Sequence, residues 1–347
     1  MKIERGERCF VAPGAAGRMA FLALFLVVAL ALGFGEGRAW AVVFNKGDVF
    51  AGVGNGLIKH FSPTGTLIET LDTTSGSTYD TGMCFDSSGN LYSTNFATST
   101  MSKFDHAGAL LSASWGSGFN ALPESCVVDS AQNVYVGQAG GSNQVLKFNS
   151  SGTPSGSFSP ALEARGTDWI DLAADQCTLL YTSEGNSVKR FNVCTNTQLT
   201  DFATGLTGPC FALRIRPNGE VMVACLSQVY RLNSDGSVHQ TYPISDGSLF
   251  ALNLDPDGTH FWTGGESSGN IYKIDIDTGN GSSAPLFNAG APVELDGLSV
   301  FGEITASQPP QAPASIPTMT EWGMIAFMFI AGLVSVYYLR RRLKKSN

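Results

Sequence analysis

The sequence predicts an all-β fold, a six-bladed β-propeller in which each blade is an antiparallel sheet of four strands. Three observations predict it: the composition, a repeat of 41 to 44 residues, and an incomplete repeat at each end of the repeating region. The chain of 347 residues contains 40 Gly, is 43% hydrophobic and is only 14% charged. This composition favours many short strands joined by tight turns, and it disfavours a helical bundle or a disordered chain.

The repeat combines a large apolar residue with a polar turn that contains Gly or Asn. Its copies begin at Phe61, Phe104, Phe148, Phe191, Leu232 and Ile274, with spacings of 43, 44, 43, 41 and 42 residues. A second landmark with hairpin-turn residues lies half a repeat earlier, over residues 85–92, 128–135, 215–222 and 254–258, with a degenerate copy over 172–181. Such a period predicts four strands, and stacking these sheets round an axis buries both faces of each.

The two ends of the repeating region predict how the ring closes. Before Phe61 there is room for strands over residues 48–53 and 57–61, but not for an innermost strand. Residues 297–301 match an innermost strand that nothing follows. We therefore expect residues 297–301 to complete the first sheet, which gives six blades rather than seven. The alternative, an open solenoid, needs capping repeats that the sequence does not show.

The N-terminal segment, residues 1–41, is predicted to be a signal peptide. It has a basic start, an apolar run over residues 19–34 and the tripeptide Ala39-Trp40-Ala41, so cleavage is expected after Ala41. The basic residues are Lys2, Arg5, Arg8 and Arg18. The alternative is an anchor helix that stays attached.

The C-terminal segment is predicted to be a membrane anchor. A linker rich in Pro, Ala, Gln and Ser covers residues 304–315, and an apolar helix of 17 residues is expected over 323–339. The basic end, residues 340–347, is expected to stay in the cytoplasm, which places the propeller (residues 42–303) across the inner membrane as a type I membrane protein.

The C-terminal tail, residues 316–347, resembles the IPTL-CTERM sorting signal of Gram-negative bacteria. The resemblance depends on Ile316, Pro317, Thr318, Glu321, Trp322 and Gly323, followed by the short helix and the Arg cluster. Met319 and Thr320 depart mildly from the usual motif. The resemblance implies an exosortase-type enzyme as a partner, removal of the helix, and delivery to the cell surface or beyond. An ordinary anchor that is never processed is the alternative.

The six cysteines that follow the signal peptide predict disulfide bonds, because their number is even in an exported domain. The hairpin register places Cys177 opposite Cys194 and Cys210 opposite Cys225, within reach of a disulfide. Cys84 and Cys126 are expected on innermost strands of neighbouring blades, where a disulfide is favoured over two buried thiols. Zinc is disfavoured because no C-x-x-C pair and no His lies beside them.

The charge distribution argues against nucleic acid as a partner. The net charge is −8, but the two ends hold ten of the 21 Lys and Arg and only four of the 29 Asp and Glu. The segment between them therefore carries a net charge of −14, which repels phosphate backbones.

A candidate site is expected at the mouth of the central channel, where the innermost strands begin. Counting back four residues from each strand landmark gives an acidic arc and an aromatic arc, either for a divalent cation or for a small polar ligand. The residues are Thr81, Glu124, Asp168, Phe211, Phe250 and Asp296. The alternative is that these side chains only cap turns. Trp169 is a candidate for stacking on a sugar, or a buried strand residue.

The repeats over residues 42–303 resemble NHL and gluconolactonase-like propellers, and also streptogramin-lyase-like propellers. The gluconolactonase-like resemblance implies a metal-dependent lactonase with Glu124, Asp168 and Asp296 as cation ligands, although the family's Asn ligand has no counterpart that we can place. A His-based lyase is disfavoured, because His60, His106, His239 and His260 fall away from the mouth. The sequence favours a non-enzymatic protein of the cell surface or extracellular matrix that binds a protein or glycan, with a divalent-cation lactonase as the alternative.

Overall fold

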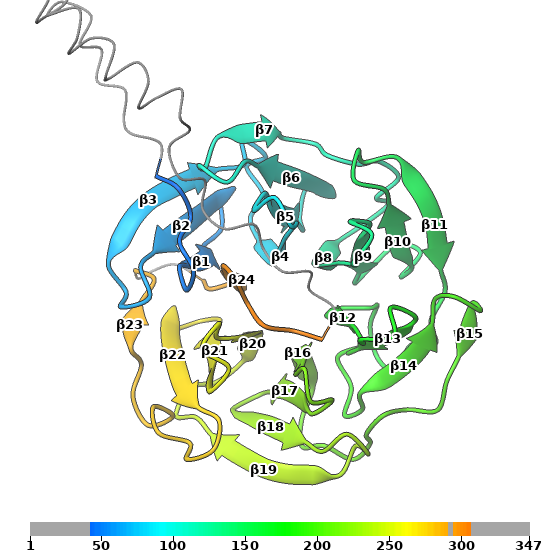
Figure 1. The fold of residues 1–347 in the computed structure, drawn as a ribbon, viewed down its shortest axis with the longest axis vertical. Helices are drawn as coiled ribbons and strands as arrows, with labels where there is room; N and C mark the ends of the chain where they lie inside the picture. Colours follow the sequence, from blue (N-terminus) through cyan, green and yellow to red (C-terminus); the bar gives the residue numbers. More distant parts are fainter. Residues whose placement is uncertain (1–41, 291–293, 307–347) are drawn as a thin grey trace, which may run out of the picture. The chain divides into compact units, whose positions relative to one another are not determined.

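A computed structural model describes residues 42–290 and 294–306 (Figure 1). The expected signal peptide, sorting motif, membrane helix and basic end lie outside these residues. Within the described residues, no helix is long and apolar enough to cross a membrane.

The described residues form six antiparallel sheets of four strands, as the repeat predicts. The first sheet contains β24 (Gly297–Val300), β1 (Val49–Gly52), β2 (Leu57–Phe61) and β3 (Leu67–Asp72). The second contains β4 (Asp80–Phe85), β5 (Leu91–Asn95), β6 (Thr100–Phe104) and β7 (Leu110–Ser112). The third contains β8 (Pro123–Val128), β9 (Val134–Gln138), β10 (Val145–Phe148) and β11 (Pro154–Phe158).

The remaining three sheets follow the same order from the channel outwards. The fourth contains β12 (Ile170–Leu172), β13 (Thr178–Tyr181), β14 (Lys189–Asn192) and β15 (Thr197–Gln198). The fifth contains β16 (Cys210–Ile215), β17 (Val221–Cys225), β18 (Gln228–Leu232) and β19 (Val238–Pro243). The sixth contains β20 (Leu249–Leu254), β21 (His260–Gly265), β22 (Asn270–Asp275) and β23 (Phe287–Asn288).

The last strand of the ring completes the first sheet, which confirms the predicted closure. β24 pairs antiparallel with β1, with Gly297 opposite Gly52 and Val300 opposite Val49. Figure 1 shows the six sheets arranged round a central axis, with β24 and β1 side by side. Every sheet therefore has an innermost strand at the channel and an outermost strand at the rim.

Burial along the strands follows this arrangement. All residues of β4 and of β8 are buried, whereas β11 and β19 at the rim are mostly exposed. Aromatic side chains pack between neighbouring blades, as with Phe61 of the first blade and Phe287 of the sixth, whose ring centroids lie 4.9 Å apart. Such contacts close the ring through packing as well as through hydrogen bonds.

Glycines allow the innermost strands of neighbouring blades to approach closely. A Cβ atom on Gly297 would lie 1.7 Å from the carbonyl oxygen of Thr81, and one on Gly82 would lie 2.3 Å from the Cα of Ser125. No side chain fits at either position, because neighbouring backbone occupies the space.

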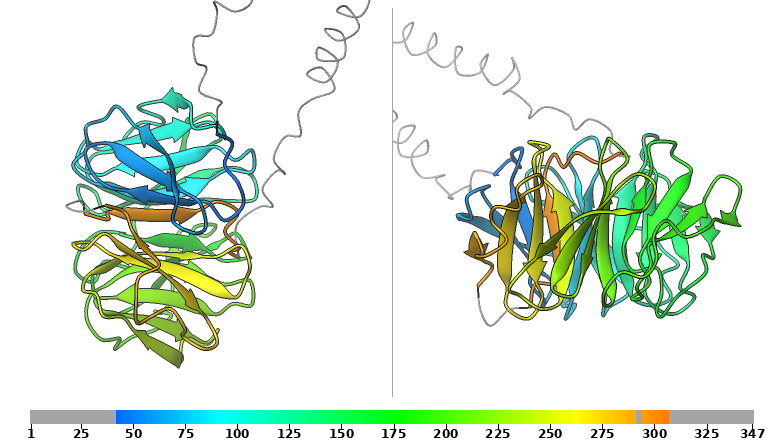
Figure 2. Two further views of the ribbon diagram at one scale, coloured as in Figure 1. Left: turned by 90° about the vertical axis from the view of Figure 1, so that its left-hand side faces the viewer. Right: turned by 90° about the horizontal axis from the view of Figure 1, so that it is seen from below.

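A segment after β24 crosses the channel at the end opposite to the start of the innermost strands. Residues 301–306 run across the ring in Figure 1 and along the upper edge of the side view in Figure 2. The buried carboxylate of Glu303 accepts a hydrogen bond from Arg214 Nε at 3.0 Å. The backbone N–H of Ala306 donates to the carbonyl oxygen of Ile215 at 3.0 Å. The packed body thus extends to residue 306.

Three disulfides join the six cysteines of the ring, in the pairs that the sequence analysis favours. Cys84–Cys126 links β4 to β8, and therefore links two neighbouring blades, with a Cα–Cα distance of 5.7 Å. Cys210–Cys225 joins directly opposed residues of β16 and β17. Cys177–Cys194 joins two turns of the fourth blade.

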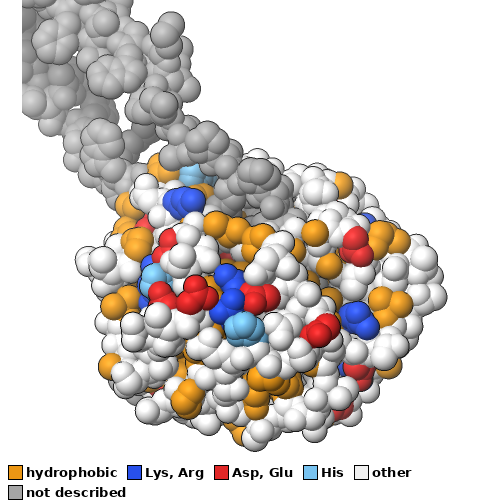
Figure 3. Space-filling view, turned by 60° about the horizontal axis from the view of Figure 1, so that its bottom comes forward, with side chains coloured by type: hydrophobic (Ala, Val, Ile, Leu, Met, Phe, Trp, Pro, Cys, Tyr) orange, Lys and Arg blue, Asp and Glu red, His pale blue; other side chains and the backbone are white. Residues whose placement is uncertain are grey.

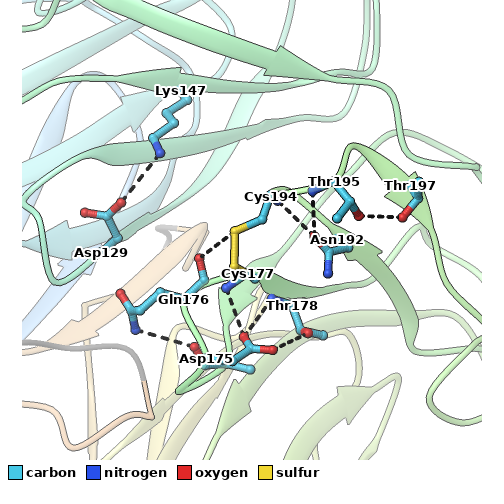
Figure 4. The surroundings of a disulfide bond; sticks show 11 residues. Asp129, Lys147, Asp175, Gln176, Cys177, Thr178, Asn192, Cys194, Thr195 and Thr197 are labelled. Atoms are coloured by element: carbon cyan, nitrogen blue, oxygen red, sulfur yellow. Dashed lines mark hydrogen bonds and ion pairs between the residues drawn. A yellow bond between two sulfur atoms is a disulfide. The ribbon is translucent and has the colours of Figure 1, made fainter.

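The turns around Cys177–Cys194 are also held by side chains (Figure 4). The Asp175 carboxylate accepts hydrogen bonds from the backbone N–H of Cys177 at 2.9 Å and from the Thr178 hydroxyl at 2.6 Å. The Asn192 side-chain oxygen accepts from the backbone N–H of Cys194 at 2.9 Å. The disulfide therefore joins two turns that are already preorganised.

Candidate functional site

The starts of the innermost strands surround a pocket of about 230 Å³ at one end of the channel. Its walls are Tyr79, Thr81, Phe96, Glu124, Arg165, Phe250, Glu266 and Asp296. Four of the six residues that the sequence places at the mouth are among them: Thr81, Glu124, Phe250 and Asp296. They come from four different blades, so the pocket exists because the ring closes.

Irregular pairing at the starts of the innermost strands leaves some of these residues without an opposite residue on the neighbouring strand. In the third blade Pro123 pairs with Gln138 and Ser125 with Gly137, so that Glu124 between them has no opposite residue. Phe250 of the sixth blade is unpaired in the same way. A bulge of this kind bends the strand and redirects the side chain of its extra residue. The equivalent positions of different blades can therefore face one pocket.

Phe211 and Asp168 occupy equivalent positions but are not among the pocket walls. Phe211 is another unpaired residue, and its ring centroid lies 5.5 Å from that of Phe250. Asp168 precedes β12, where its backbone N–H donates to the carbonyl oxygen of Thr182 at 3.2 Å. Phe211 therefore contacts a pocket wall, and Asp168 is linked to the wall residue Glu124 by their mutual effect on pKa.

Asp296 is a buried carboxyl group that the protein leaves unsatisfied. It is 2% exposed, and neither of its carboxylate oxygens has a hydrogen-bond partner among the described residues. Burial, together with the nearby charges of Glu294 and Glu266, raises the pKa of Asp296 from 3.8 to about 8. The backbone of Asp80 opposes this rise only weakly. Without a bound cation Asp296 therefore keeps its proton near neutral pH.

Glu124 and Asp168 are two further buried carboxyl groups, and each affects the pKa of the other. Burial raises the pKa of each, Glu124 raises the pKa of Asp168 further, and Glu184 raises both. The Arg165 guanidinium lowers both pKa values without reversing the rise. Oε2 of Glu124 has no hydrogen-bond partner within the described part of the chain. Ionisation of both carboxyl groups is therefore unfavourable, and the pair favours binding of a proton or of another cation.

Counting one position per blade missed two charged walls of the pocket, Arg165 and Glu266, and also the carboxyl group of Asp80. Asp80, next to Thr81, is fully buried, and burial raises its pKa from 3.8 to about 7. Arg165 lies in the loop before β12, where Nη1 is 2.9 Å from Oε1 of Glu184. Its guanidinium lies over the ring of Phe96, 5.6 Å from the centroid. No repeat pattern marks Arg165, because it belongs to a connection between blades.

No ready-made metal centre is present in residues 42–290 and 294–306. No three side chains of His, Cys, Asp or Glu there lie close enough together to hold one metal ion. Glu124, Asp168 and Asp296 contribute to one mouth, but they do not form the three-ligand set that the gluconolactonase-like resemblance implies.

Other candidates from the sequence have structural roles. Trp169 is 1% exposed and packs against the Arg214 guanidinium at 5.2 Å, so it is buried and unavailable for stacking on a sugar. His60 is fully buried, stacked on Phe50 with centroids 4.4 Å apart, and 2.9 Å from the Asp48 carboxylate. Neither residue lines the mouth.

The charged side chains on the opposite face are paired, unlike those of the mouth. Arg216 pairs with Glu220, and Arg231 lies 3.0 Å from Glu220 and 2.9 Å from Asp277. Figure 3 shows Lys, Arg, Asp, Glu and His side chains gathered near one another on the surface. Two basic and two acidic side chains thus balance one another on this face.

The comparisons with known proteins support the fold. No family model and no curated protein matches the chain. The structure is similar to the WD40 β-propeller domain of Doa1, with a TM-score of 0.50 and 16% identity over 63% of this chain and 72% of that chain. It is also similar to a protein of unknown function from Bacteroides caccae, with a TM-score of 0.58 and 12% identity over 73% of this chain and 98% of that chain. At these identities the likeness shows the β-propeller fold alone.

Proposed function

We propose that this chain is an exported, envelope-sorted propeller that binds a protein or glycan partner at the mouth of its channel, without chemical turnover. One observation carries the proposal: the pocket is built from four or more blades and holds buried carboxyl oxygens that have no partner among the described residues. Unsatisfied buried polar groups are rare in proteins and usually mark a function.

Export and sorting are supported by the two ends of the sequence and by the cysteines. The A-x-A site before residue 42 and the tail over residues 316–347 are those of an exported, surface-sorted protein. Three disulfides, one of which joins two blades, suit an oxidising compartment outside the cytoplasm. We infer an exosortase-type enzyme as the partner of the tail, and a membrane-anchored intermediate before release.

Binding, rather than catalysis, is favoured by the chemistry of the mouth. The carboxyl groups of Glu124 and Asp296 are paired neither with a His nor with a nucleophile in the pocket wall. The wall also holds three aromatic rings, of Tyr79, Phe96 and Phe250, which provide contact area for a ligand.

Arrays of glycans and peptides test the proposed binding. The purified full chain is compared with a variant carrying Glu124→Gln and Asp296→Asn, and with Asp235→Asn, which changes an exposed acid on the opposite face. We expect the parent chain and Asp235→Asn to bind the same array features and the double variant to lose them. Binding that survives in the double variant would place the site elsewhere and overturn the proposal.

A lactone-hydrolysis assay tests the alternative activity. Turnover of lactones that needs calcium or manganese and disappears in Glu124→Gln would replace the binding proposal with a metal-dependent lactonase.

Mass spectrometry of both ends of the native protein tests the sorting. An N-terminus at residue 42 and loss of residues 324–347 are the expected results. A mature protein that keeps residues 324–347 would mean that the tail is an ordinary membrane anchor that is not processed.

A further inference from the structure

We propose that the mouth pocket takes a compact organic cation, a primary ammonium or a guanidinium group, held by the carboxylates of Glu124 and Asp296 and by the face of Phe250. The inference rests on the proposed function, because it names the ligand chemistry of the same mouth. The shared chemistry has two sources, a free diamine or a basic side chain of a partner protein.

The balance of charge at the mouth favours a cation. Among the pocket walls three carboxyl groups, of Glu124, Glu266 and Asp296, face one cation, Arg165. The Arg165 side chain is 42% exposed and already bound to Glu184. Its charge lowers the pKa of Glu124 without reversing the rise, so acidic groups outnumber basic groups in the pocket.

The buried carboxyl oxygens lack hydrogen-bond donors. Both oxygens of Asp296 and Oε2 of Glu124 are unpartnered within the described residues, although each residue is only 2% exposed. A buried acceptor without a donor costs free energy. An ammonium group brings three N–H donors and a guanidinium brings five, so either group supplies what the pocket lacks.

The aromatic walls select an organic cation over a metal ion. The face of an aromatic ring attracts ammonium and guanidinium groups within about 6 Å of its centroid. Arg165 over Phe96, at 5.6 Å, is an example within the same pocket. A calcium ion instead takes six to eight oxygen ligands, and no three acidic, His or Cys side chains gather for one in the described ranges. Phe250, backed by Phe211, offers a comparable ring beside the carboxyl groups.

Cation binding should release protons, because burial raises the pKa of Asp296 and of Glu124. The other charged groups that influence these two carboxyls are Asp80, Asp168, Glu184, Glu266, Glu294 and Arg165. The charges of Glu184, Glu266, Glu294 and Asp80 favour retention of the proton, whereas Arg165 and the hydrogen bond from Asp168 favour its loss from Glu124. A bound cation reverses this preference, so the affinity for an amine should rise between pH 6 and pH 8.

Isothermal titration calorimetry of the full chain tests the inference. The probes are 1,4-diaminobutane and Nα-acetyl-lysine amide, with Nα-acetyl-norleucine amide as a neutral analogue of the same shape, and with calcium chloride as the metal control. Titrations in two buffers of different ionisation enthalpy count the protons released. Asp235→Asn is the control variant, since it removes one acidic charge from the opposite face.

The expected result is binding of at least one amine and not of the norleucine compound, with release of protons and at least about tenfold tighter binding at pH 8 than at pH 6. Glu124→Gln and Asp296→Asn should each weaken binding at least about tenfold, which corresponds to the loss of one charge-assisted hydrogen bond. Asp235→Asn should bind as the parent does. Tighter binding of the diamine would identify a free diamine, and tighter binding of the lysine compound a basic side chain.

Three results would overturn the inference: no heat with either amine, amine binding that Glu124→Gln and Asp296→Asn leave unchanged, or binding of calcium alone. If the amines fail while the arrays show binding that the double variant loses, the mouth is still a ligand site and only the organic cation is wrong. If neither experiment shows binding, both proposals fail. Variants that melt cooperatively at or above the parent temperature show that these losses do not come from misfolding.

Discussion

Replacing Asp296 with Asn should remove a pH dependence that the parent protein shows. Folded Asp296 keeps its proton up to about pH 8, whereas the unfolded chain releases it near pH 3.8. The folded state therefore binds more protons than the unfolded state between these values. The free energy of unfolding must consequently fall as the pH rises through this window.

The size of the effect follows from the two pKa values. Each pH unit between 3.8 and 7 lowers the free energy of unfolding by about 1.4 kcal/mol for one proton, which gives a total loss of up to about 4 kcal/mol by pH 7. Asn has the shape of the protonated acid and cannot ionise. We therefore expect Asp296→Asn to equal the parent near pH 4 and to be more stable by up to about 4 kcal/mol at pH 7.

Urea unfolding of the full chain at pH 4, 5, 6 and 7 measures this difference. The free energy of unfolding should fall more steeply with pH for the parent than for Asp296→Asn, by an amount that corresponds to up to one proton. The control Asp235→Asn should keep the steep fall of the parent. The other buried acids of the mouth still give the variant some slope. Equal slopes for the parent and Asp296→Asn would mean that Asp296 ionises at an ordinary pH, and the burial argument would then be refuted.

Three further changes test the ring itself, and urea unfolding measures each of them. Gly297→Ala should cost about 3 kcal/mol, because its Cβ would overlap backbone at 1.7 Å. The control Gly247→Ala, with nothing within 4 Å of its Cβ, should change stability by less than about 0.5 kcal/mol. Equal costs for the two variants would contradict the close approach of the blades. Replacing both Cys84 and Cys126 with Ser opens a loop of 42 residues and should cost about 4 kcal/mol, and a loss below about 1 kcal/mol would mean that the link between blades adds little. Glu303→Gln should cost about 3 kcal/mol because it removes the carboxylate that pairs with the buried Arg214 guanidinium at 3.0 Å, and an unchanged midpoint would show that the crossing segment is not needed.

Much of the fold could be predicted because propeller sheets leave a regular trace in sequence. The turn at Phe61 and its five later copies set the number of blades, and the unpaired match at residues 297–301 set the closure. The hairpin register also indicated Cys177–Cys194 and Cys210–Cys225, because facing residues in a hairpin have a constant sum of positions. These features are local or periodic, so one sequence contains them.

The site was predictable only in part, since a pocket depends on details that no period records. Counting found Glu124 and Asp296, but it missed the pocket walls Glu266 and Arg165, and Asp80 beside Thr81. Whether a strand-entry side chain turns towards the channel depends on a bulge, and bulges have no fixed sequence signal here. Burial and missing partners, which make Asp296 chemically unusual, are properties of the closed ring and not of its neighbours in sequence.

The pairing of β24 with β1 also constrains the order in which a growing chain can mature. The ribosome finishes residues 49–52 long before it reaches residues 297–300, so one edge of β1 has no permanent neighbour during synthesis. Asp296 immediately precedes β24 in the chain and reaches the mouth only when that strand docks. A nascent or prematurely terminated chain would therefore have neither a sealed first blade nor a finished pocket, and both would be completed in the same late step.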